Sequence, residues 1–137
     1  MKCLVVDDSS LTRRILVNSL KQMGFETVLE AADAEAAITQ CTADLALIMT
    51  DWNMPGMSGV DLVRKIRQDP ALVHIPVLLV TARHIKDDMS EATRAGVSGF
   101  VVKPFTPDIL TRKIQELMNA ARPAADAPPE AATGTDG

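Results

Sequence analysis

The sequence is poor in cysteine and in aromatic residues. Its 137 residues include two cysteines, one tryptophan, three phenylalanines and no tyrosine. Cys3 and Cys41 lie far apart and form no Cys-x-x-Cys motif, so a disulfide framework, a zinc site and a redox motif all lack support. We interpret both cysteines as small core residues. No apolar run approaches the roughly 18 residues of a membrane-spanning helix, and no signal-peptide core follows Met1. We therefore expect a cytoplasmic protein without membrane insertion.

Positive charge is not in excess. The chain has 14 Lys and Arg against 18 Asp and Glu, which gives a net charge of −4. Three of the acids and none of the basic residues fall in residues 123–137, so the remaining 15 acids and 14 basic residues leave the body at −1. A near-neutral body lacks the basic stripe that binds a phosphate backbone. The composition argues against direct binding of nucleic acid.

Large apolar residues are absent from the C-terminal segment 123–137, which consists mainly of Ala, Pro, Gly and scattered acids. Such a segment cannot bury enough surface to offset the entropy of ordering. We expect a globular domain over residues 1–122 and a disordered acidic tail over 123–137. Composition leaves open whether the tail is natural or is a linker to a further output domain.

Short β-branched runs alternate with helical periodicities through the body. The strands are expected at 2–6, 26–29, 44–50, 75–80 and 99–102. Helices are expected between them and over 108–121, with an N-cap at Ser9 or Ser10 for the first helix and at Asp33 for the second. Five strands alternating with five helices predict an α/β fold with a doubly wound five-stranded parallel sheet.

Apolar side chains at helical spacing predict which helix faces are buried. In the first helix this stripe is Leu11, Ile15, Leu16 and Leu20. In the second helix it includes Ile38, and in the last it includes Ile109. The only tryptophan, Trp52, is expected at the rim of the binding edge and partly exposed.

Acidic residues follow two of the predicted strands where those strands end. Asp7 and Asp8 follow the first strand, and Asp51 follows the third. In open parallel sheets the binding crevice lies at the carboxyl ends of the strands. If these two strands are neighbours, three carboxylates converge, and they would repel one another unless a cation is present or a pKa rises. A hard divalent cation, and Mg²⁺ in particular, fits ligands from Asp8, Asp51 and a backbone carbonyl.

Two further polar residues stand at strand ends. Thr81 follows the fourth strand and Lys103 the fifth. A metal ion, an ammonium group and a hydroxyl around one carboxylate would form a receptor for a phosphoryl group on Asp51. The histidines carry less weight: His74 and His84 have no second ligand at metal spacing and are interpreted as loop residues.

Four separated segments resemble the signature of the two-component receiver domain of CheY-like chemotaxis regulators: Val5-Val6-Asp7-Asp8-Ser9, Thr50-Asp51 through Gly59, Thr81-Ala82 and Lys103-Pro104-Phe105. The resemblance covers residues 1 to about 120. It implies the strand order 2-1-3-4-5, which is known for CheY and is expected here on the strength of the resemblance alone. It also implies that a histidine kinase donates a phosphoryl group to Asp51, with Mg²⁺ held by Asp8, Asp51 and the backbone carbonyl of Asn53, and with Asp7 acting through water.

The resemblance further implies a switch. Thr81 would turn toward the phosphoryl group and vacate space for the ring of Phe100. Receivers of this kind often carry Tyr at the position of Phe100, and Phe offers a partner no hydroxyl. The expected protein is not an enzyme beyond phosphotransfer to Asp51 and its autodephosphorylation. It acts on a downstream protein in chemotaxis or motility, as a monomer or weak dimer.

Three alternatives stay open at this point. The chain could be the receiver fragment of a longer regulator. It could be a phosphatase of the haloacid-dehalogenase type, although that class has Asp-x-Asp and this sequence has Ser9 two residues after Asp7. It could be a flavodoxin-like cofactor binder, although Asp7 and Asp8 would repel the cofactor's phosphate.

Overall fold

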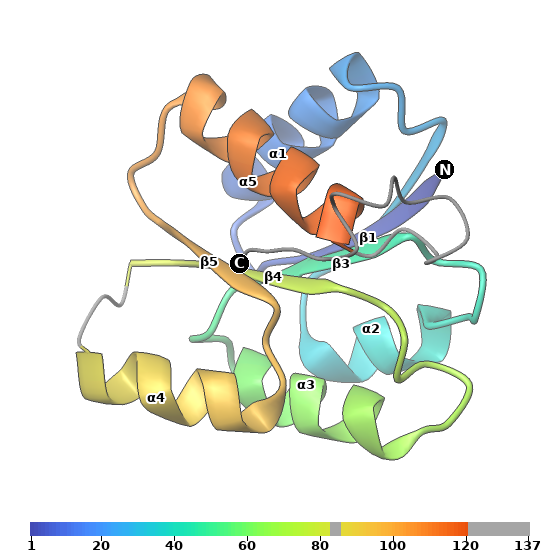
Figure 1. The fold of residues 1–137 in the computed structure, drawn as a ribbon, viewed down its shortest axis with the longest axis vertical. Coiled ribbons are helices and arrows are strands. Elements are labelled where there is room, and N and C mark those ends of the chain that lie inside the picture. The colour runs from blue at the N-terminus through green and yellow to red at the C-terminus, as the bar shows by residue number, and fades with distance from the viewer. Residues whose placement is uncertain (83–85, 121–137) are drawn as a thin grey trace, which may run out of the picture.

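The computed structural model describes residues 1–82 and 86–120 and contains five strands and five helices in strict alternation (Figure 1). The strands are β1 (Lys2–Val6), β2 (Thr27–Ala31), β3 (Leu47–Thr50), β4 (Val77–Thr81) and β5 (Gly99–Val102). The helices are α1 (Ser10–Gln22), α2 (Ala34–Gln40), α3 (Gly59–Gln68), α4 (Lys86–Ala95) and α5 (Pro107–Ala120). His84 and the predicted tail 123–137 lie outside the described residues.

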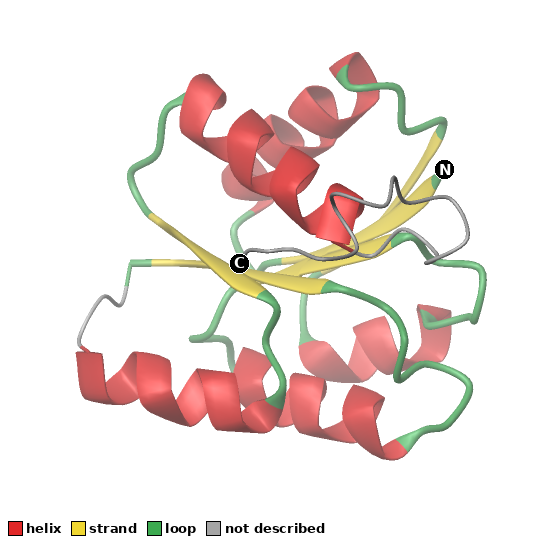
Figure 2. Cartoon of the chain, viewed as in Figure 1, coloured by secondary structure: helices red, strands yellow, loops and turns green. Residues whose placement is uncertain are grey.

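All strand pairings are parallel, and the strand order is β2-β1-β3-β4-β5. Helices α1 and α5 cover one face of the sheet, and α2, α3 and α4 cover the other (Figures 1 and 2). This arrangement confirms the predicted doubly wound α/β fold and the strand order that the family resemblance implied. Within the described residues, no helix is long and apolar enough to span a membrane.

The central strands are apolar on both faces because each face meets a helical layer. Side chains alternate between the two layers: Leu4, Val6 and Ile48 pack toward the α2–α4 side, whereas Val5 and Met49 pack toward α1 and α5. Cys3 is fully buried in the second cluster, and Cys41 is half-buried against the first. Both cysteines are free thiols, as expected from their surroundings.

Short polar side chains begin the helices. Ser9 is the N-cap of α1, and its hydroxyl accepts from the backbone N–H of Thr12. Asp33 caps α2 through the N–H of Ala36 at 2.7 Å, as predicted. Each cap satisfies one of the N–H groups that the first helical turn leaves without a partner.

Three of the strand boundaries differ from the predicted ones. The structure begins β3 at Leu47 and not at residue 44, because Leu45 lies in a turn closed by its N–H on the carbonyl of Thr42. β4 begins after Pro76, which has no N–H for the sheet, and extends to Thr81. β2 is displaced toward the C-terminus, to Thr27–Ala31.

Part of the predicted apolar stripes was wrong. Leu16 and Leu20 of α1 are buried, but Leu11 is 67% and Ile15 is 46% exposed. At 100° per residue these two side chains turn away from the sheet, which Leu16 and Leu20 face directly. Ile38 and Ile109 are also exposed. Apolar spacing identified the helices correctly but made their buried faces too wide.

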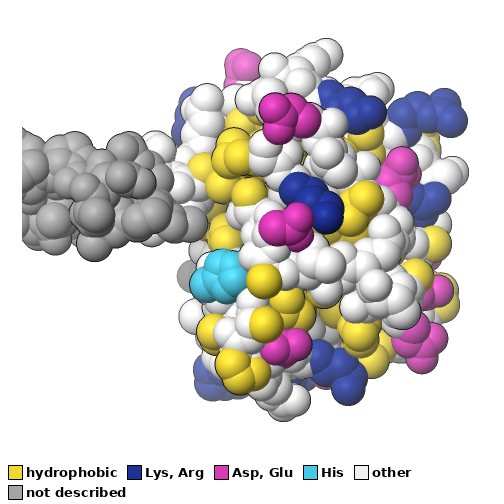
Figure 3. Space-filling model, turned by 90° about the vertical axis from the view of Figure 1, so that its right-hand side faces the viewer, with side chains coloured by type: hydrophobic (Ala, Val, Ile, Leu, Met, Phe, Trp, Pro, Cys, Tyr) yellow, Lys and Arg dark blue, Asp and Glu magenta, His cyan; other side chains and the backbone are white. Residues whose placement is uncertain are grey.

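The face at the amino ends of the strands carries mixed charge. Figure 3 shows this side, with basic and acidic side chains interspersed among apolar ones. Lys2 at the start of β1 pairs with Asp44, and the N-terminal amino group pairs with Glu26. The surface drawn there has no broad field of one sign.

Candidate functional site

The polar residues singled out in the sequence meet at the carboxyl edge of the sheet. Val6 and Thr50 are register partners in the β1–β3 pair, so the next residues, Asp7 and Asp51, leave the sheet side by side. The backbone N–H of Asp51 donates to the carbonyl of Val6 at 3.0 Å and continues the ladder by one step. Parallel register thus brings together carboxylates that are far apart in sequence.

Lys103 joins these two carboxylates. Its Nζ lies 3.0 Å from Asp7 Oδ2 and 3.0 Å from Asp51 Oδ2. The side chain of Asp7 is 1% exposed, that of Asp51 13% and that of Lys103 22%. Burial alone would lower the pKa of Lys103, but hydrogen bonds and charge attraction from Asp7 and Asp51 outweigh it, so this pKa is raised. Lys103 is therefore a fixed cation between two buried acids.

Asp8 completes an acidic cluster with Asp7 and Asp51. One carboxylate oxygen of each lies within 4.8 Å of the others. Asp8 is exposed, whereas Asp7 is buried and accepts from the N–H of Ser9 at 2.8 Å. Oxygen ligands at this separation are the donor set that Mg²⁺ prefers. The cluster therefore fits a hard divalent cation, with Asp8 and Asp51 as the accessible ligands.

The other oxygen of Asp51 is held by the backbone that follows it. Asp51 Oδ1 accepts from the N–H of Trp52 at 2.6 Å and from the N–H of Asn53 at 3.4 Å. The loop that makes these contacts needs a glycine at Gly59, because a Cβ there would lie 1.9 Å from the carbonyl oxygen of Asp51. Gly59 was named above only as the end of the segment that begins at Thr50-Asp51, and its spacing gave no sign of this close approach. The role of the Asn53 carbonyl as a metal ligand stays a prediction.

Trp52 is not at the rim, as the sequence analysis expected. It is 5% exposed and packs in the apolar cluster between the sheet and α2–α4. Its side chain lies on the same side of the sheet as that of Ile48 of β3, and both belong to this cluster. Met54 and Met57 are partly buried against the same cluster.

Thr81 and Phe100 are neighbours on one face of the sheet. Thr81 pairs with Val102 in the β4–β5 register, and Phe100 pairs with Leu79, two residues earlier on β4. Side chains two residues apart on a strand share a face. Thr81 is 2% exposed, and Phe100 is partly buried against the cluster that includes Ala92 and Ala95 of α4. The pair can therefore transmit a change at the acidic edge toward α4.

Arg13 is a site residue that the sequence analysis missed. From the first turns of α1 it donates through Nη1 to the backbone carbonyl of Asp7 at 2.5 Å and through Nε to Glu30 at 3.2 Å. An arginine one turn into a helix is ordinary in sequence, so nothing in its spacing indicated this contact.

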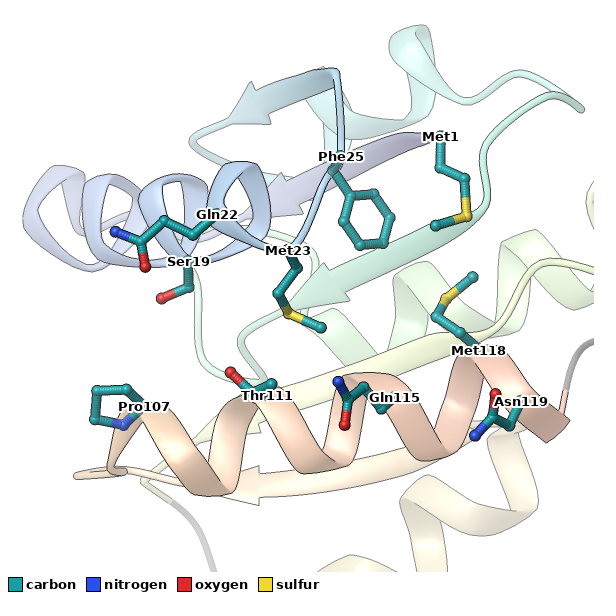
Figure 4. Close-up of a pocket in the computed structure, with 10 residues that line it drawn as sticks. All are labelled: Met1, Ser19, Gln22, Met23, Phe25, Pro107, Thr111, Gln115, Met118 and Asn119. Atoms are coloured by element: carbon teal, nitrogen blue, oxygen red, sulfur yellow. The ribbon is translucent and has the colours of Figure 1, made fainter.

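The acidic edge is separate from a groove of about 670 Å³ between α1 and α5 (Figure 4). Phe25, Met1, Met23 and Met118 line that groove together with polar residues of both helices. None of the four polar site residues Asp7, Asp8, Asp51 and Lys103 lines it. The acidic site thus lies at an edge of the sheet and not within this groove.

Comparisons with known proteins agree on one family. The profile described as Response regulator receiver domain matches residues 3–115. The chain is 48% identical over 118 residues to the chemotaxis protein CheY of Pseudomonas aeruginosa, a match that covers 85% of this chain and 95% of the relative. It is 44% identical over 120 residues to chemotaxis protein CheY1 of Helicobacter pylori, covering 86% and 97%.

Solved structures give the same result. The chemotaxis response regulator CheY4 of Vibrio cholerae superposes with a TM-score of 0.79 at 32% sequence identity. That match covers 85% of this chain and 97% of the solved one. The family match over residues 3–115 includes every strand end that contributes to the acidic site.

Proposed function

Because the chain belongs to the response regulator receiver domain family, we propose that Asp51 accepts a phosphoryl group from the phosphohistidine of a histidine kinase. An oxygen of the Asp51 carboxylate attacks phosphorus, the phosphorus–nitrogen bond to the histidine breaks, and the imidazole keeps the electron pair. The product is an acyl phosphate on Asp51. Its hydrolysis by water returns the carboxylate and releases phosphate.

The observation that carries this proposal is the position of Lys103 between Asp51 and Asp7. Its ammonium group lies 3.0 Å from an oxygen of each acid. The negative charge of the transferred phosphoryl group would lie beside Asp51, where the ammonium of Lys103 already provides a fixed positive charge. Such preorganised charge is usually the largest contribution to phosphoryl transfer.

The residues that would hold Mg²⁺ are Asp8, Asp51 and the backbone carbonyl of Asn53, with Asp7 acting through water. Support comes from the three carboxylates within 4.8 Å of one another and from the exposure of Asp8. When bound, the cation neutralises charge on the acids and on the incoming phosphoryl oxygens. The rest of the site then orients the carboxylate: the N–H groups of Trp52 and Asn53 fix one oxygen of Asp51.

The output of the switch would pass through Thr81 and Phe100. We propose that the hydroxyl of Thr81 contacts the phosphoryl group and that the Phe100 ring enters the space it leaves, which changes how the α4 side of the domain binds a protein. The shared sheet face of the two residues supports this coupling. Relatives named chemotaxis proteins favour a target in chemotaxis or motility.

The test is phosphorylation of the purified protein by acetyl phosphate or by a cognate kinase in Mg²⁺, followed by intact-mass spectrometry. One phosphoryl group is expected on the wild type and none on Asp51→Asn. Asp44→Asn, an exposed acid at the opposite edge of the sheet, is the matched control and should be labelled like the wild type. Undiminished labelling of Asp51→Asn, or turnover of small phosphate esters, would contradict the proposal.

A further inference from the structure

Every backbone and carboxylate polar atom of Asp7 has a protein partner. Its N–H donates to the carbonyl of Ala31 at 3.1 Å, Oδ1 accepts from Ser9 N–H at 2.8 Å, and Oδ2 accepts from Lys103 at 3.0 Å. The remaining atom, the backbone carbonyl oxygen, accepts from Nη1 of Arg13 at 2.5 Å. Asp7 is therefore locked in place, and Arg13 provides the contact on its C-terminal side.

The guanidinium of Arg13 is itself held at two points. Nη1 reaches the carbonyl of Asp7, and Nε reaches Oε1 of Glu30 on β2 at 3.2 Å. The side chain of Arg13 is only 18% exposed. A planar guanidinium fixed at two of its N–H groups defines both the distance and the orientation of what it binds. Arg13 is thus a rigid link between α1, β2 and the residue that precedes Asp8.

The carbonyl of Asp7 and the N–H of Asp8 belong to one planar peptide group. Holding that carbonyl fixes the peptide plane, which contains the Cα of Asp8, and so limits the positions from which the Asp8 side chain can leave the backbone. Asp8 is exposed, and none of the described residues donates a hydrogen bond to its carboxylate. The orientation of this ligand therefore depends on the backbone, and the backbone depends on Arg13.

We infer that Arg13 is a positioning residue for the metal site: by holding the Asp7–Asp8 peptide it aims the Asp8 carboxylate at the cation. The inference rests on the proposed function, because it assumes that Asp8 binds Mg²⁺. The positive charge of Arg13 would by itself lower the affinity for Mg²⁺, because it repels the metal cation. Glu30 pairs with that charge at 3.2 Å and so reduces the repulsion.

The experiment is a calorimetric titration of the metal-free protein with MgCl₂ at fixed ionic strength. Removing an outer-sphere partner of a metal ligand typically weakens affinity 10- to 100-fold, and we expect a loss of about 10-fold for Arg13→Gln. Arg13→Lys keeps the positive charge and can still donate one hydrogen bond to the carbonyl of Asp7, so it should recover part of the affinity. Glu30→Gln leaves the contact with Asp7 but frees the guanidinium, and should weaken binding in the same direction by less.

The matched control is Arg14→Gln, which removes the same charge from the next, exposed position of α1. Near-wild-type affinity for Arg14→Gln together with the loss for Arg13→Gln supports the inference. Equal affinity for wild type and Arg13→Gln, or equal losses for Arg13→Gln and Arg14→Gln, overturns it. If Arg13→Gln does not fold, as judged by circular dichroism, Glu30→Gln decides, and wild-type affinity for that variant overturns the inference. A wild-type protein that binds no Mg²⁺ contradicts the proposed function itself, and this inference with it.

Discussion

The ammonium group of Lys103 lies 3.0 Å from the carboxylate of Asp51, although 52 residues separate the two in sequence. The same group lies 3.0 Å from the buried carboxylate of Asp7. Lys103 therefore has a structural and a chemical role at once, because it neutralises an acid cluster in the folded protein and stands beside the proposed phosphoacceptor. A bound cation would share the first of these roles.

Lys103→Ala should lower the free energy of unfolding of the metal-free protein by about 1–2 kcal/mol, less than for a fully buried pair because Lys103 is partly exposed. The loss arises because Asp7 stays buried without its charged partner. In saturating Mg²⁺ the loss should be smaller, since the cation replaces part of the missing charge. Urea unfolding with and without Mg²⁺ measures both, with Lys113→Ala as the control, because this half-exposed lysine of α5 pairs, among the described residues, only with Glu116 on the surface. Identical losses in the two conditions would argue against a cation at the cluster.

Thr81→Ala should leave labelling of Asp51 largely intact and weaken the phosphorylation-dependent gain in affinity for the target. The substitution removes the contact that distinguishes the two states of the switch, and a ligand shifts an equilibrium only through such a difference. Phe100→Ala should likewise reduce output more than labelling. Affinity for the target, measured with and without phosphorylation, decides the matter. Equal gains in wild type and Thr81→Ala would exclude this route of coupling.

Arg67→Met should destabilise the fold by about 2–3 kcal/mol, because it removes hydrogen bonds to three backbone carbonyls, two of them in part-buried contacts. The guanidinium donates to the carbonyls of Gly96, Val73 and Ile75 at 3.0, 3.0 and 2.7 Å. It thereby ties α3 to the segments before β4 and β5. Thermal or urea unfolding measures the effect, and Lys65→Met, an exposed neighbour on α3, is the control. A loss no larger than that of the control would show that these contacts contribute little.

Gly96 gives a companion test of the same contact. Its φ of +108° disfavours any side chain, and a Cβ there would lie 2.7 Å from Cγ of Arg67. Gly96→Ala should therefore destabilise the protein, and its effect should be less than additive with that of Arg67→Ala, because truncation at Cβ removes the Cγ, Cδ and Nε atoms that the new Cβ would meet. Strict additivity in the double mutant would contradict this reasoning.

Regular patterns made much of the fold predictable. A strand that is apolar on both faces, such as β3, must lie between two helical layers, and acids directly after such strands must meet at one edge. Asp7, Asp8 and Asp51 were identified in this way, and Thr81 and Lys103 were identified because they too stand at the ends of predicted strands. The strand order came from the family resemblance, since the alternation of strands and helices is the same for several orders.

What the sequence did not predict depends on contacts between distant residues. Arg13 and Arg67 act by reaching backbone carbonyls, and a carbonyl has no signature in sequence. Trp52 was expected at the rim because it follows Asp51, but the direction in which the chain turns there decides its burial. Leu11 and Ile15 match a helical stripe, yet how much of that stripe the sheet covers is fixed only by how α1 packs.

The buried thiol of Cys3 should make the free energy of unfolding fall with rising pH in the alkaline range. Burial raises the pKa of the Cys3 thiol far above its ordinary value, whereas in the unfolded chain it is about 8.5. The folded state therefore keeps the proton that the unfolded state loses, and stability falls as pH rises above about 8.5, by up to about 1.4 kcal/mol per pH unit. Cys3→Ala should flatten this slope in urea unfolding between pH 8 and pH 10. An unchanged slope would contradict the assignment, because the remaining groups would then account for all of it.

Trp52 should report binding of Mg²⁺, although it is buried. The backbone N–H of Trp52 donates to Asp51 Oδ1 at 2.6 Å. Any reorientation of the Asp51 carboxylate toward a cation therefore changes the electric field at the indole and the backbone that carries it. We expect Mg²⁺ to change the intrinsic fluorescence saturably at fixed ionic strength, and Ca²⁺ to do so less well, because it prefers more oxygen ligands at longer distances. Asp8→Ala should greatly weaken the response, whereas Asp44→Ala at the opposite edge should not. Asp8→Ala should also stabilise the metal-free protein by up to about 1 kcal/mol, because it relieves repulsion from Asp7 and Asp51. Solvated acids without a site predict only the small screening effect that NaCl reproduces. A flat titration, or one that is the same in Asp8→Ala, would therefore contradict a metal site at the three carboxylates.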